Sequence, residues 1–191
     1  MGGPGGHRRR RSRGISGCGV PGIPFTRIIG IGNEHRRDDG VGIWVARQIA
    51  AAEWRGVAVT TLNAGDGAAL LSAWQGARSA YLVDAVSAEA RPGTILRIDA
   101  RRSPTIDRRR FLSSHGLGVI EAVELGRVLG MLPDRIVIYG IVGRSFEHGS
   151  ELSTDVAQAA RQVIGRLRRV AWKESRADAR AIHDEGVGAP G

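Results

Sequence analysis

Three short segments of the chain carry residue types that can bind a metal ion or activate a water molecule. They are residues 30–40 (GIGNEHRRDDG), residues 83–85 (VDA) and residues 114–116 (SHG). Each segment stands at the end of an apolar run or in the loop beside one. A fold that aligned these ends would bring two carboxylates and one imidazole together, a set that can hold a divalent metal or polarise water.

The candidate site residues are Asp39, Asp84 and His115, and each also has an ordinary structural explanation. Asp38 or Asp39 can cap the helix expected after them, but one cap needs only one acid. Asp84 stands at the mouth of an apolar strand, where a carboxylate is costly unless it is paired, binds a ligand or accepts bonds from loop amides. His115 alone could be an ordinary loop histidine.

The combined set points to hydrolytic chemistry assisted by a metal. Imidazole suits nickel, zinc or iron, whereas carboxylates suit harder ions. A bound metal polarises a carbonyl group and lowers the pKa of bound water, and hydrolysis of an amide needs both effects. A serine or cysteine nucleophile is not indicated, because Cys18 lies in a Gly- and Arg-rich stretch and no Gly-x-Ser-x-Gly motif is present.

Composition predicts one globular domain. The chain has 191 residues, of which 42% are hydrophobic and 25% charged, values typical of a soluble protein with a real core. No apolar run approaches the roughly 20 residues of a membrane span. A single cysteine excludes an internal disulfide, so we expect a cytoplasmic location, and we expect a monomer.

The net charge of +9 does not by itself predict a nucleic-acid partner. Six of the positive charges fall between Arg8 and Arg27 with no acid among them, and such like-charge blocks are usually solvated tails. The sequence has no zinc-ligand spacing and no aromatic stacking platform. We therefore expect no specific binding of nucleic acid.

Apolar runs and turn residues alternate along the chain and predict strands alternating with helices. The expected strands are 26–31, 57–62, 80–83, 94–98 and 135–141. A first helix is expected to start at Asp38 or Asp39, and three more are expected over 68–74, 117–129 and 154–170, the last capped by Ser153. This order predicts an α/β three-layer sandwich, with a mainly parallel twisted sheet of about five strands between helices. We expect a disordered Gly/Arg-rich tail over 1–26, the folded domain over 27–172 and a flexible tail over 173–191.

Ligand groups gather at the carboxyl ends of strands in such sheets. Asn33, Asp39 and Asp84 are each expected directly after a strand, and His115 could return to the same edge. A dinucleotide-binding Gly-x-Gly-x-x-Gly motif is incomplete, because His35 stands where the third glycine belongs. The two glycines are better explained by a tight turn and close backbone approach.

Five blocks of sequence in order carry a resemblance to a known family. They are residues 30–42 (GIGNEHRRDDGVG), 82–85 (LVDA) with 92–94 (PGT), 113–117 (SSHGL), 132–141 (LPDRIVIYGI) and 145–153 (SFEHGSELS). Across about residues 27–170, the sequence resembles the endopeptidases that mature nickel–iron hydrogenases. The resemblance implies a twisted sheet between helix layers.

The resemblance also implies an activity. Members of the family remove a short C-terminal extension from the hydrogenase large-subunit precursor after nickel insertion. The positions of Asp39, Asp84 and His115 would be the metal-contacting and catalytic set of an aspartyl-type endopeptidase. The metal would be the nickel of the precursor, so no tightly bound cofactor is expected.

Three other functions remain open from the sequence. A metal-dependent hydrolase of the same fold would carry its own ion. A nucleotide-binding α/β module would bind NAD or ATP in spite of its incomplete motif. A non-catalytic maturation chaperone would keep the fold and dock the precursor without cutting it.

Overall fold

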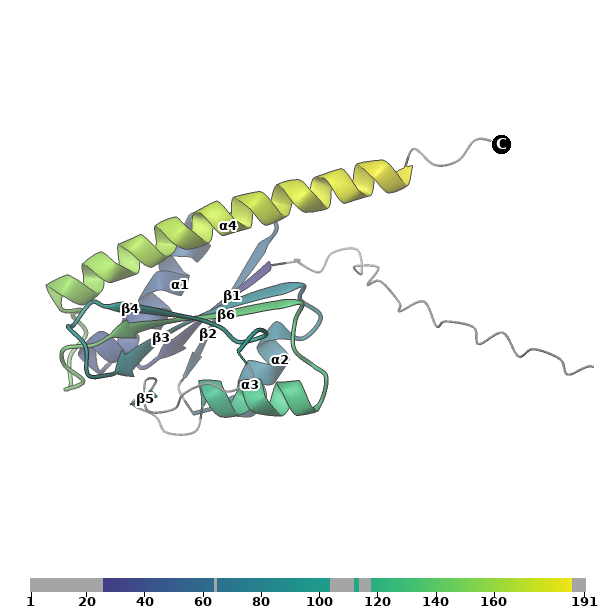
Figure 1. Cartoon of the computed structure of the whole chain (residues 1–191). Helices are drawn as coiled ribbons and strands as arrows, with labels where there is room; N and C mark the ends of the chain where they lie inside the picture. The colour runs from purple at the N-terminus through teal and green to yellow at the C-terminus, as the bar shows by residue number, and fades with distance from the viewer. Residues whose placement is uncertain (1–25, 64, 104–111, 114–117, 187–191) are drawn as a thin grey trace, which may run out of the picture.

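The computed structural model describes residues 26–63, 65–103, 112–113 and 118–186. Within these ranges the chain forms a sheet with helices on both faces (Figure 1). The strands are β1 (Thr26–Gly32), β2 (Val57–Asn63), β3 (Ser79–Ser87), β4 (Ile95–Asp99), β5 (Leu112–Ser113) and β6 (Arg135–Val142). The helices are the 3-10 turn η1 (Arg37–Gly40), α1 (Val41–Ala51), α2 (Gly67–Trp74), α3 (Val119–Val128) and α4 (Thr154–Gly186).

The sheet has the strand order β2-β1-β3-β6-β4, with the short β5 paired to β3. β2, β1, β3 and β6 run parallel to one another, whereas β4 is antiparallel to β6 and β5 is antiparallel to β3. The central strands are apolar and buried on both faces, as parallel strands covered by helices must be. The predicted α/β sandwich with a mainly parallel sheet is confirmed.

Two cores lie on the two faces of the sheet. Adjacent residues of a strand point to opposite faces, so Ile28 packs in the core under α1 and α4 while Ile29 packs in the core under α2 and α3. Trp74 of α2 is fully buried in the second core. The helices of the described ranges include none with the length and apolar character that a membrane crossing requires.

β3 is longer than the sequence predicts. The expected strand ended at Val83, but β3 continues to Ser87 because Ala85 and Val86 keep pairing with β6. Asp84 therefore lies inside the strand, opposite Gly140, and the prediction that it directly follows the strand is wrong.

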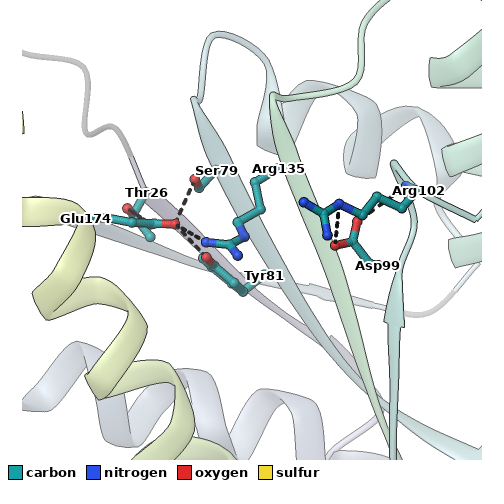
Figure 2. Close-up of polar contacts among 7 residues, drawn as sticks. All are labelled: Thr26, Ser79, Tyr81, Asp99, Arg102, Arg135 and Glu174. Atoms are coloured by element: carbon teal, nitrogen blue, oxygen red, sulfur yellow. Dashed lines mark hydrogen bonds and ion pairs between the residues drawn. The ribbon is translucent and has the colours of Figure 1, made fainter. Parts of the chain in front are cut away.

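α4 is also longer than predicted, since it was expected to end at Val170 and continues to Gly186 (Figure 1). The helix thus includes residues 173–186 of the expected flexible tail over 173–191, whose flexibility stays a prediction. The carboxylate of Glu174 accepts hydrogen bonds from Thr26 Oγ1 at 2.8 Å, Ser79 Oγ at 3.0 Å and Tyr81 Oη at 2.6 Å (Figure 2). Arg135 Nη1 lies 3.4 Å from the same carboxylate. We call these five residues the Glu174 cluster; it attaches α4 to the amino ends of β1, β3 and β6.

The predicted tail over residues 1–26 falls almost wholly outside the described residues.

Candidate active site

The turn after β1 positions Asp39. Gly32 has a φ of +145°, and a Cβ there would lie 1.9 Å from the carbonyl oxygen of Asp39. The backbone N–H of Asn33 donates to that same oxygen at 3.2 Å. Only glycine fits at position 32, and the predicted close backbone approach is confirmed. The space beside this glycine is filled by the chain's own backbone, so the glycine does not serve to admit a phosphate.

The neighbouring strand β3 carries Asp84 to the same edge of the sheet. Val83 pairs with Gly30 of β1, and a Cβ at Gly42 would lie 2.2 Å from the carbonyl oxygen of Val83. The first turn of α1 therefore lies directly on β3, beside Asp84, and η1 contacts β3 as well. Asp39 and Asp84 are 0% and 1% exposed. The structure thus buries both predicted carboxylates beside the start of α1, Asp39 in η1 and Asp84 within β3.

Asp38 has a different position from the one predicted. The N-cap of α1 is Gly40, and neither η1 nor α1 has a side-chain cap hydrogen bond, so the prediction that Asp38 or Asp39 caps this helix is wrong. The carboxylate of Asp38 instead accepts four hydrogen bonds from the loop after β6. The donors are Arg144 N at 2.8 Å, Ser145 N at 3.0 Å, Ser153 N at 2.7 Å and Ser153 Oγ at 2.9 Å. A fully buried carboxylate needs such donors, and the loop supplies them.

The same two loops are joined by their backbones. Arg37 N donates to Gly149 O at 2.7 Å, Asp38 N to Ser145 O at 3.2 Å and Gly149 N to His35 O at 3.0 Å. Sequence reasoning missed this junction, because it joins residues as far as 115 positions apart. The one signal available was Ser153, which was interpreted as the cap of the helix that begins at Thr154 and whose hydroxyl also donates to Asp38.

Glu34 in the turn after β1 is paired with Arg47 of α1 on the protein surface. The hydrogen bond from Arg47 holds the pKa of the Glu34 carboxyl below its usual value. Both side chains are exposed, so this pair contributes little to the free energy of unfolding.

His115 lies outside the described residues. Its described neighbours are Ser113, which pairs with Val86 of β3, and Gly118, which precedes α3. No group of three or more His, Cys, Asp or Glu side chains within the described ranges could hold a metal ion. The structure gives the positions of Asp39 and Asp84. The joint site of these two acids with His115 stays a prediction.

Comparisons with known proteins agree with this fold. Three solved structures are similar: HybD, a [NiFe] hydrogenase maturation protease from Thermococcus kodakarensis (TM-score 0.60, 21% identity, 76% of this chain and 98% of that chain); the hydrogenase maturating endopeptidase HybD from E. coli (0.59, 22%, 76% and 93%); and the maturation protease HycI from Thermococcus kodakarensis KOD1 (0.59, 19%, 79% and 94%). No curated protein matches the chain.

A family model described as hydrogenase maturation protease, HycI, matches residues 44–169. The match begins within α1 and ends within α4, so it includes most of the folded chain together with Asp84 and His115, while Asp39 precedes it. This chain belongs to the hydrogenase maturation protease family, a family of peptidases.

Proposed function

We propose that this protein removes the C-terminal extension of a nickel–iron hydrogenase large-subunit precursor after nickel has been inserted. Asp39, Asp84 and His115 would contact the nickel of the precursor. The observation that supports this proposal most strongly is the pair of buried carboxylates on two contacting elements, Asp39 in η1 and Asp84 in β3, in a chain of this family. We further propose that the protein acts as a monomer in the cytoplasm.

Electrostatics favour a cation at this edge. Asp38, Asp39 and Asp84 are all buried. Three carboxylates on the contacting elements η1 and β3 concentrate negative charge there, and a divalent cation is one partner that offsets the cost of burying that charge. Ser113, two residues before His115, pairs with Val86, two residues after Asp84. This pairing of Ser113 with β3 supports the proposal that His115 acts together with Asp84.

A substrate-borne ion explains how cleavage could wait for nickel. Precursor without nickel offers these side chains no cation, so the binding free energy of the metal contacts is absent. Once nickel is present, the ion can polarise a nearby carbonyl group of the precursor. The enzyme then needs no metal of its own.

A processing assay tests the proposal. Nickel-loaded and nickel-free precursor are incubated with the protein, and the precursor mass is measured by mass spectrometry. We expect shortening of the nickel-loaded form alone. Asp39→Asn, Asp84→Asn and His115→Ala variants, each shown to be folded by circular dichroism, should leave the precursor uncut. Cleavage retained in all three variants would reject the proposed site.

A further inference from the structure

We propose that Asp38 is a positioning residue, which fixes the turn carrying Asp39 by binding the loop of residues 143–153. This inference rests on the proposed function, because it gives Asp38 a purpose only if Asp39 acts on the substrate. Asp38 itself would touch neither the metal nor the reacting atoms.

The hydrogen bonds carry the argument. Asp38 Oδ2 accepts from Arg144 N, Ser145 N and Ser153 Oγ, and Asp38 Oδ1 accepts from Ser153 N, all at 2.7–3.0 Å. Charge-assisted bonds of this length are stronger than those between neutral groups. One carboxylate therefore ties both ends of the loop to η1, and it does so from a fully buried position.

The next residue along η1 is Asp39, so any shift of Asp38 is passed to it through one peptide unit. Asp39 is held from the other side by β1, since its carbonyl oxygen packs on Gly32 and accepts from Asn33 N. Arg36 adds a further tie, because its Nε donates to Phe146 O at 3.1 Å. The turn between β1 and α1 is thus held between the strand and the 143–153 loop, which it binds through the Asp38 carboxylate and the Arg36 guanidinium.

This arrangement explains why two adjacent acids occur in the turn. Asp38 accepts from the backbone donors of the loop, while Asp39 lies beside it in η1, which contacts β3, the strand of Asp84. Neutralising Asp38 would leave the loop amides facing an amide group and would let the turn move. A misplacement of about 1 Å can cost about 100-fold in rate.

The test compares two matched serine variants with Asp38→Asn. Ser153 Oγ donates to Asp38 at 2.9 Å. Ser79 Oγ donates to Glu174 at 3.0 Å, at the amino end of β3 and outside the proposed junction. Each variant loses one hydroxyl-to-carboxylate bond, but only Ser153→Ala touches the proposed junction. Precursor processing is measured as kcat and KM well below the unfolding temperature, and hydrogen exchange is followed over residues 143–153.

We expect Asp38→Asn to lower kcat by about 10- to 100-fold with KM nearly unchanged, from the cost of misplacement above. Ser153→Ala should lower kcat less, Ser153→Thr should restore it, and Ser79→Ala should keep it. Hydrogen exchange over the 143–153 loop should become faster in Asp38→Asn and Ser153→Ala, but not in Ser153→Thr or Ser79→Ala. Normal kcat in folded Asp38→Asn, or an equal loss in Ser153→Ala and Ser79→Ala, would overturn the inference.

If Asp38→Asn does not fold, the two serine variants decide the question. The proposed function is tested separately by Asp39→Asn. Retained cleavage in Asp39→Asn refutes the role of Asp39 itself. Lost cleavage in Asp39→Asn together with normal kcat in Asp38→Asn refutes only the positioning role.

Discussion

Replacing Glu174 with alanine should destabilise the protein, although the residue lies beyond the predicted end of the folded domain. The substitution removes the acceptor for the hydroxyl groups of Thr26, Ser79 and Tyr81, which are only 2–5% exposed. A buried donor left without a partner costs about 1–3 kcal/mol. Glu174 is itself 17% exposed, so water can reach the vacated position and replace part of what is lost.

We therefore expect Glu174→Ala to lower the free energy of unfolding by about 3 kcal/mol, near the lower end for three such donors. The midpoint of thermal unfolding should fall by roughly 10 °C, at about 2–4 °C per kcal/mol for a protein of this size. Urea denaturation followed by circular dichroism gives the first quantity and a thermal scan gives the second.

Arg102→Ala is the matched control, because it also breaks an ion pair drawn in Figure 2. Arg102 is 88% exposed and its Nε lies 3.9 Å from Asp99. Such a surface pair contributes about 0–1 kcal/mol. If Glu174→Ala lowers the free energy of unfolding no more than Arg102→Ala does, the argument that the Glu174 cluster anchors α4 is refuted.

Three further predictions concern the pKa of Tyr81, the close packing at Gly32 and the metal content of the protein. Burial and the neighbouring Glu174 carboxylate raise the pKa of Tyr81. Above about pH 10 the folded state therefore holds a proton that the unfolded state has lost, so the free energy of unfolding should fall as the pH rises further. Tyr81→Phe should flatten this fall in urea titrations between about pH 8 and 11, and an unchanged slope of the free energy of unfolding against pH would contradict the prediction. Gly32→Ala should abolish cleavage and lower the free energy of unfolding by more than about 2 kcal/mol through the clash with Asp39. The control Gly56→Ala, at a positive φ but in open space, should lower it by only about 1–2 kcal/mol. Equal losses of unfolding free energy in the two variants would refute the packing role of Gly32. Elemental analysis of protein purified without chelators should find no stoichiometric zinc, iron or nickel, and one equivalent of zinc or iron would favour a hydrolase with its own ion.

Local patterns predicted most of the fold. The strands around Ile28 and Ile138 are continuous apolar runs ended by turn residues, and such runs have few alternatives in a chain that alternates them with helices. The helix expected over 68–74 is present as α2, and the Asp66 side chain caps it by accepting from Ala69 N at 2.8 Å. Signals of this kind lie within a few residues of the feature that they predict.

The features that were missed depend on partners far along the chain. α4 passes Val170 because Glu174 meets donors on β1 and β3, and no local pattern reveals those donors. Asp38 does not cap α1 because the loop ending at Ser153 offers it four donors. Asp84 could be recognised as a candidate from its type and apolar neighbours, but its place inside β3 follows from pairing with β6.

The central claim is that Asp39, Asp84 and His115 together recognise an ion brought by the substrate. The most direct test measures the affinity of the protein for nickel-loaded and nickel-free precursor by calorimetry, for the wild type and for each of the three single variants. We expect the wild type to bind the loaded precursor more tightly, and Asp39→Asn, Asp84→Asn and His115→Ala each to remove most of that difference. Equal affinities of the wild type for the two precursors, or a nickel preference that survives all three substitutions, would contradict the account.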